Sequence, residues 1–162
     1  MMQIGDLQNN FNAVGTLQWI GIRPARRSNM LVLKEASVEP GSGIVGDRFK
    51  GTVKSKRQVS LVQAEHLDVI AKLVKLERVP PEMLRRNLVV SGINLLALKG
   101  QQFRVGNALL EYSGLCHPCS RMEEIFGRGG YNATRGHAGI LARVIEAGHF
   151  SLGDEVSVLV PL

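Results

Sequence analysis

Cysteine is scarce in this chain of 162 residues, which has only Cys116 and Cys119, both within the stretch CHPC at 116–119. Two thiols are too few for an iron–sulfur cluster held only by cysteine. The sequence shows no haem motif either. Any electrons that the protein uses are therefore expected to come from an external donor.

Long hydrophobic runs are also absent. No stretch approaches the roughly 20 apolar residues that a transmembrane helix needs, and residues 1–15 have no basic region followed by an apolar run. We therefore expect a cytoplasmic protein without a membrane partner. Thiols stay reduced in that compartment, so a structural disulfide is not favoured.

Aromatic residues are few, with five Phe, two Tyr and one Trp, whereas the net charge is +6. Nucleic-acid-binding proteins usually combine clustered positive charge with exposed aromatic rings. Here the Lys and Arg residues are scattered in twos and threes, so no nucleic-acid partner is expected. A generally basic surface and a localised anion site both remain as interpretations.

Glycine, in contrast, is abundant at 18 residues, which indicates many tight turns and short strands. A one-faced apolar stripe predicts a helix over 64–74. Ser120 and Glu123 form a capping-box pattern at the start of a short helix over 120–127, and Pro80 and Pro81 open a third short helical segment. Strands are predicted at 14–22, 30–38, 58–62 and 88–92, in a hairpin over 103–114 turning at Gly106-Asn107, and at 139–148 and 154–160, joined through Gly153-Asp154.

Strands therefore dominate and a regular alternation of strand and helix is missing. This pattern predicts a mainly β fold, a β-barrel-like domain with a few short helices, rather than a doubly wound α/β fold. The length fits a single domain over 1–162, with a core at about 14–158.

The two cysteines allow several interpretations. Cys-x-x-Cys before a helix is the arrangement of dithiol redox proteins, but these need a βαβ context. A zinc site assembled from Cys116, Cys119, His117 and His137 lacks the second ligand pair that such sites usually have. In a third interpretation, one thiolate acts alone as a nucleophile or soft metal ligand. Core packing is the fourth.

Cys119 is the better candidate for a single functional thiolate. It immediately precedes the predicted helix, where free backbone N–H groups face it, and Arg121 adds positive charge nearby. Cys116 falls at the end of a predicted strand, where a buried thiol is common. We therefore assign Cys116 to packing.

The order of four motifs resembles the MOSC family, named for the C-terminal domain of molybdenum cofactor sulfurase, in its small stand-alone form. These are GIVGDRFKG ending at Gly51, KRQVSLVQAEHL at 56–67, RRNLVVSGINL at 85–95, and the Pro118-Cys119 pair after a strand that ends in glycine. The resemblance covers about residues 14–158. Many members have a histidine where this chain has Phe49.

The resemblance implies a β-barrel-like fold and two related chemistries for Cys119. In one, its thiolate is the metal ligand and catalytic residue of a bound molybdenum cofactor (molybdopterin), in a reductase of N-hydroxylated compounds. In the other, Cys119 carries a persulfide for assembly of a metal–sulfur cofactor. A third hypothesis, from a different class, is a non-enzymatic module that binds a pterin or another anion.

Molybdopterin carries a phosphate, so its site must be cationic, and guanidinium groups bind phosphate well. His137 is a second candidate catalytic residue, because histidine titrates near neutral pH. The expected partners are a small-molecule substrate and a protein that donates electrons or sulfur, with a homodimer also open. The candidate cofactor-binding residues are Arg48, Arg57, Arg86, Asn87, Arg121 and Asp47.

Overall fold

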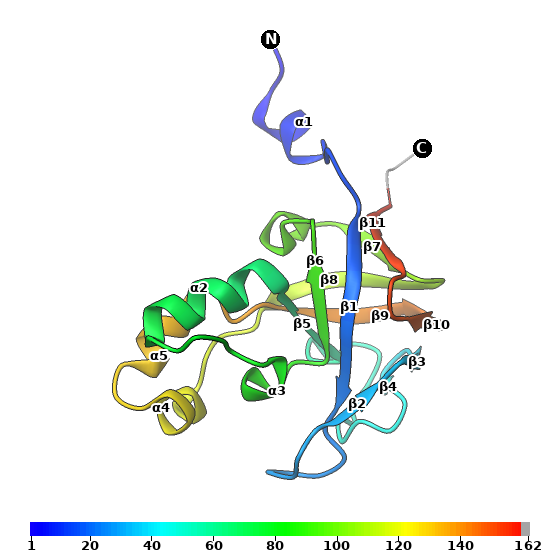
Figure 1. Ribbon diagram of the computed structural model, residues 1–162. Helices are drawn as coiled ribbons and strands as arrows, with labels where there is room; N and C mark the ends of the chain where they lie inside the picture. Colours follow the sequence, from blue (N-terminus) through cyan, green and yellow to red (C-terminus); the bar gives the residue numbers. More distant parts are fainter. Residues whose placement is uncertain (160–162) are drawn as a thin grey trace.

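The computed structural model describes residues 1–159 and shows a β-barrel with helices gathered on one side (Figure 1). Seven strands close the barrel in the order β11-β7-β8-β9-β5-β6-β1, and β11 pairs with β1. The prediction of a mainly β, barrel-like fold with a few short helices is therefore confirmed. The barrel strands are β1 (Gly15–Ile22), β5 (Val59–Gln63), β6 (Leu88–Ser91), β7 (Gln102–Val105), β8 (Ala108–Leu115), β9 (Ile140–Glu146) and β11 (Glu155–Val158).

The helices lie outside the barrel. Figure 1 shows α2, α3, α4 and α5 together on one side, whereas α1 stands apart near the N-terminus. None of the helices in residues 1–159 has the length and apolar character needed to cross a membrane. Their bounds are α1 (Ile4–Gln8), α2 (Ala64–Val74), α3 (Pro81–Leu84), α4 (Ser120–Phe126) and α5 (Gly130–Thr134), with a 3-10 helix at Leu95–Leu98.

One neighbouring pair in the barrel is parallel, β5 with β6. Parallel neighbours need a long crossover, and here α2 and α3 supply it. The residues of β5 and β6 are buried almost without alternation, because one face looks into the barrel and α2 covers the other. Leu67, Ile70 and Ala71 of α2 pack there against Val62 and Val89.

The barrel interior forms a separate apolar core. It is built by inward-facing residues of all seven strands, including the fully buried ring of Phe103. The fully buried ring of Phe150, which lies outside these strands, also belongs to this core. β7 shows the expected alternation of buried and half-buried residues. The hairpin turns at Gly106-Asn107 as predicted, and Gly106 has a positive φ of 55°, which glycine adopts without strain.

Two strand predictions need correction. The segment 30–38 is two strands, β2 (Leu31–Leu33) and β3 (Glu35–Glu39), because the chain leaves the barrel edge at Lys34. β3 instead pairs with β4 (Gly43–Ile44) and β10 (Gly148–Ser151) in a small second sheet. The C-terminal part therefore holds three strands rather than two, and the end of the strand predicted at 154–160 lies outside the described residues.

The predicted capping box of the 120–127 helix is also wrong. The residue that caps α4 is Cys119, which makes no side-chain capping bond. The carboxylate of Glu123 instead accepts hydrogen bonds from the backbone N–H groups of Gly129 and Tyr131, at 3.1 and 3.0 Å. These bonds hold the pKa of Glu123 below its ordinary value. Glu123 thus ties α4 to the start of α5.

Candidate functional site

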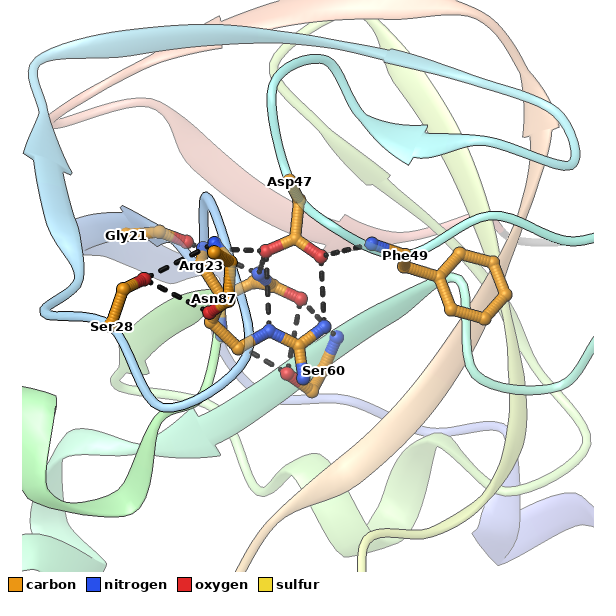
Figure 2. A network of polar contacts seen from close by, with 8 residues as sticks. Gly21, Arg23, Ser28, Asp47, Phe49, Ser60 and Asn87 are labelled. Atoms are coloured by element: carbon orange, nitrogen blue, oxygen red, sulfur yellow. Dashed lines mark hydrogen bonds and ion pairs between the residues drawn. The ribbon is translucent and has the colours of Figure 1, made fainter.

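A buried polar network connects the end of β1 with the loop after β4 and the start of β6 (Figure 2). Asp47 lies at its centre, and its carboxylate accepts hydrogen bonds from the Arg23 guanidinium at 2.8 and 3.2 Å. The backbone N–H groups of Arg23 and Phe49 donate to the same carboxylate at 2.7 and 3.0 Å. Asn87 Nδ2 completes the set at 3.2 Å.

The surroundings of Asp47 keep it ionised. Burial alone would raise the pKa of this carboxyl group, but the hydrogen bonds and charge of Arg23 outweigh burial and bring the pKa below its ordinary value of 3.8. The side chain of Asp47 is 1% exposed, whereas that of Arg23 is 21% exposed. The buried carboxylate therefore fixes the position of the Arg23 guanidinium, and part of the Arg23 side chain remains exposed to solvent.

That edge of Arg23 faces a cavity of about 240 Å³, here called the thiol cavity. Cys119, an exposed free thiol, lies in its wall. Arginines from four separate segments line the same space as Cys119. The lining residues are Arg23, Arg26, Arg27, Arg48, Arg85, Cys119, Ser120, Arg121 and Glu124.

Negative charge at the thiol cavity is limited to one lining carboxylate within residues 1–159. Glu124 Oε2 lies 3.6 Å from Arg27 Nη1 and 3.5 Å from Arg121 Nη1. Arg26, Arg48 and Arg85 have no ion pair within the described part of the chain. Burial lowers the pKa of Arg85, and repulsion from Arg121 lowers it further. This excess of positive charge favours an anionic ligand.

The backbone around the cavity is constrained. Arg27 and Arg85 have positive φ angles of 60° and 56°, which residues other than glycine rarely adopt and which often mark functional sites. Arg85 Nη1 donates to the carbonyl of Ser28 at 2.6 Å. This bond ties the loop between β1 and β2 to the end of α3, so two walls of the thiol cavity are held together.

A second cavity, of about 400 Å³, adjoins the first. It is here called the Phe49 cavity, and its lining residues are Arg23, Arg48, Phe49, Lys50 and Arg57. Arg23 and Arg48 line both cavities, so the two adjoin at these residues. The Phe49 cavity lies in the size range of small-molecule sites, about 300–1,000 Å³.

The two cysteines belong to different environments. Cys116 is 2% exposed and lines a small, mostly apolar cavity with Leu96, Leu115 and Pro118. Its backbone N–H donates to the carbonyl of Gly139 at 2.9 Å. Both thiols are free. The structure therefore separates one exposed thiol among arginines from one buried thiol, which agrees with the assignment of Cys116 to packing.

The zinc interpretation has no support in the described residues. No group of three or more His, Cys, Asp or Glu within residues 1–159 is placed to hold a metal ion. The ring of His137 lies against His66 of α2, edge to face, with 5.2 Å between ring centroids. His137 does not line either basic cavity within the described part of the chain, so its catalytic role stays a prediction.

The structure places the other predicted site residues in two locations, the cavity walls and the buried network behind them. Cys119, Arg48 and Arg121 line the thiol cavity, and Arg57 lines the Phe49 cavity. Asp47 and Asn87 lie in the buried network behind them, where Asn87 also binds Ser60 and the carbonyl of Gly21. This placement favours a positioning role for both.

Arg86 lies deeper than expected for an anion contact. Its Nε and Nη1 donate to the carbonyls of Ala138 and Leu84, both at 2.8 Å. Burial lowers the pKa of Arg86, and the nearby Cys116 offsets part of this decrease. Arg86 therefore joins the start of β6 to the loop before β9, beneath the cysteine stretch.

Sequence reasoning missed four arginines that line the thiol cavity: Arg23, Arg26, Arg27 and Arg85. The first three belong to the run RPARR directly after β1, and that density of arginine in a loop was a usable signal. Arg85 stands in the RRNLVVSGINL motif beside Arg86, the residue that the sequence predicts as a cofactor contact. Its neighbour Arg86 looks equivalent in sequence. The left-handed backbone conformation at Arg85 makes the two side chains point in different directions.

The letters GSGIVG at 41–46 fit the dinucleotide-binding pattern G-x-G-x-x-G, which requires a turn from a strand into a helix. Here they connect β3 to β4 and run into the loop that carries Asp47, and no helix follows before β5. The pattern does not form a dinucleotide-binding turn in this fold.

Comparison with known proteins agrees with this geometry. The family model of the MOSC domain matches residues 27–157, whereas no curated protein matches the chain. The crystal structure of YuaD from Bacillus subtilis is similar with a TM-score of 0.78 and 22% identity, covering 93% of this chain and 98% of that one.

Two further solved structures share the fold. YiiM from Escherichia coli has a TM-score of 0.69 and 19% identity, over 91% of this chain and 71% of its own. YiiM from Geobacillus stearothermophilus has a TM-score of 0.70 and 14% identity, over 90% and 75%. With the family model covering most of its length, the chain belongs to the MOSC domain family, which is associated with binding of the molybdenum cofactor.

Proposed function

We propose that this chain binds the molybdenum cofactor in the thiol cavity, with the Cys119 sulfur as the protein's ligand to the metal, as a component of a reductase for N-hydroxylated compounds. The observation that carries this proposal is that six arginines line the same cavity as one exposed thiol. A soft sulfur ligand and a surplus of guanidinium groups are what a metal dithiolene with a phosphate requires.

The residues present fit such a group. Arg26, Arg48 and Arg85 have no carboxylate partner within residues 1–159, and Arg121 Nε is buried there without a hydrogen-bond partner. Buried polar atoms are normally paired, so a ligand acceptor beside Arg121 would remove an unfavourable feature. Arg23, fixed by Asp47, offers its exposed edge to the same ligand.

The roles of the chain are binding and orientation. When bound, the cofactor supplies the two-electron chemistry that removes oxygen from an N–O bond. Cys119 fixes the metal end, the arginines hold the anionic end, and the Asp47–Asn87 network keeps Arg23 in place. Electrons come from a separate donor protein.

A sulfur carrier is the second candidate, and one observation favours it. Cys119 is exposed, whereas Cys116 is buried and lines another cavity. A persulfide on Cys119 forms when its thiolate takes the sulfane sulfur of a donor persulfide, which leaves as a thiolate. Because no second thiol shares the thiol cavity within residues 1–159, internal attack would not discharge the persulfide.

The test is an N–O reduction assay with a chemical reductant, on protein made in a host that synthesises the cofactor. We expect turnover of an aromatic amidoxime by the wild type, loss of turnover in Cys119→Ser, and near-normal turnover in Cys116→Ser. Absence of turnover together with cyanide-labile sulfur on Cys119 would establish the carrier. Anion binding without turnover, with the same affinity in Cys119→Ser, would instead support the non-enzymatic binding module.

A further inference from the structure

The Phe49 cavity differs in chemistry from the thiol cavity beside it. Its lining combines four cations with one aromatic ring and contains no acidic residue among the described ones. Arg23 is paired with Asp47, but Arg48, Lys50 and Arg57 make no ion pair within residues 1–159. The cavity therefore offers three positive charges without an ion pair in the described part of the chain, beside one aromatic ring.

Phe49 is held in this position by its neighbours. Its backbone N–H donates to Asp47 Oδ2 at 3.0 Å, and Figure 2 shows the ring pointing away from the Arg23–Asp47 contact. A Cβ atom at Gly51 would lie 2.7 Å from the ring atom Cζ of Phe49 and 2.5 Å from Ser55 Oγ. Only glycine at position 51 leaves room for the ring where it lies.

The loop that joins Phe49 to Arg57 is also held in place by the buried side chain of Gln58. Gln58, which is 1% exposed, donates from Nε2 to the carbonyls of Thr52, Val53 and Ser55, at 3.2, 3.1 and 2.9 Å. Its Oε1 accepts from the backbone N–H groups of Gly41 and Val144. The backbone between Phe49 and Arg57 is thus held in place before a ligand arrives, which lowers the entropic cost of binding.

From this geometry we infer that the Phe49 cavity is the substrate subsite, and that it selects a planar aromatic compound bearing a carboxylate or phosphate-type anion. The ring of the substrate lies on Phe49, its anionic group is bound by Arg57 and Lys50, and its N-hydroxylated end extends past Arg48 to the thiol cavity. This assignment of a substrate class rests on the proposed function.

The aromatic ring is what distinguishes this subsite from a simple phosphate site. A phosphate is bound by guanidinium and ammonium groups alone, and it gains nothing from an aromatic face. Stacking of two rings adds binding free energy beyond that of burying their area. Selectivity for an aromatic anion over an aliphatic anion of equal charge is therefore the property to measure.

The experiment uses two probes with the same charged group, phenylphosphonate and methylphosphonate, and metal-free protein in a titration calorimeter. We expect phenylphosphonate to bind about threefold to tenfold more tightly. Phe49→Ala should abolish this preference, and Phe49→Leu, which keeps an apolar side chain, should reduce it. Arg57→Gln should weaken both probes about threefold to tenfold, whereas Lys54→Gln, outside the lining, should change neither.

Equal affinity for the two probes, or a preference that survives Phe49→Ala, would overturn the subsite. The second arm compares kcat/KM of the loaded protein for an aromatic amidoxime with and without a ring carboxylate, where the carboxylate should help the wild type but not Arg57→Gln. A wild type that fails to take up molybdenum overturns the proposed function, while the probe titrations still decide whether the cavity selects aromatic anions.

Discussion

The guanidinium of Arg23 meets the carboxylate of Asp47 through two parallel contacts, Nη2 to Oδ2 at 2.8 Å and Nε to Oδ1 at 3.2 Å. This bidentate geometry fixes the plane of Arg23, whose exposed edge lines both the thiol cavity and the Phe49 cavity. One buried carboxylate therefore sets the position of the cation that the two cavities share.

Asp47→Asn should lower the free energy of unfolding by about 2–4 kcal/mol, because the amide nitrogen faces donors and Arg23 loses its counter-ion. Urea unfolding followed by circular dichroism measures the change. Asp68→Asn, at an exposed position of α2, is the matched control and should shift stability by less than about 0.5 kcal/mol. A similar small effect for both variants would contradict the structural role of Asp47.

The contribution of Asp47 should depend on pH in a defined direction. Burial raises the pKa of Asp47 and Arg23 lowers it by more, so the folded value lies below 3.8. The stabilisation is then complete above the unfolded pKa and is lost as the pH falls through the folded one. The difference in unfolding free energy between wild type and Asp47→Asn should be constant above about pH 5 and shrink below about pH 4. A difference that grows on acidification would refute this sign.

The two thiols should differ sharply in reactivity. Iodoacetamide should modify native protein at Cys119 alone, since Cys116 is buried, and denaturant should make both sites available. Peptide mass spectrometry locates the label. Fast labelling of Cys116 in the native state would mean that the cysteine stretch opens, and it would revive the dithiol interpretation.

The pKa of His66 should depend on both His137 and Glu65. Burial lowers the pKa of His66 below 6.5, the nearby His137 lowers it further, and Glu65 acts in the opposite direction. Titration by NMR should show a higher His66 pKa in His137→Asn and a lower one in Glu65→Gln. Shifts of the same sign in both variants would be inconsistent with the observed ring contact.

Much of the fold was predictable because it follows from local pattern. The apolar stripe at 64–74 gave α2 with the observed bounds, and the Gly106-Asn107 turn gave the β7–β8 hairpin. Closure of the barrel was harder to predict from the sequence. The pairing of Gly15 with Val156 joins opposite ends of the chain, and no local propensity reports it.

Part of the lining of the thiol cavity was predictable from the sequence, and its geometry was less so. Cys119 was identified through its motif. Arg48 was identified through its place in the glycine-rich loop, and Arg121 through its place near Cys119. Arg27 and Arg85 reach the same cavity through left-handed backbone turns, which the sequence does not reveal for arginine. Arg86 looked like a ligand contact, but its carbonyl partners come from residues 84 and 138, and such long-range partners appear only in three dimensions.

The central claim is that Cys119 ligates molybdenum within the arginine-lined thiol cavity. The most direct test is the molybdenum content of purified protein by elemental mass spectrometry, after expression in a host that makes the cofactor, with Cys119→Ser and Cys116→Ser alongside. We predict near-stoichiometric metal in the wild type and in Cys116→Ser, and its loss in Cys119→Ser. Absence of metal from all three proteins, or equal metal in the wild type and Cys119→Ser, would contradict the claim.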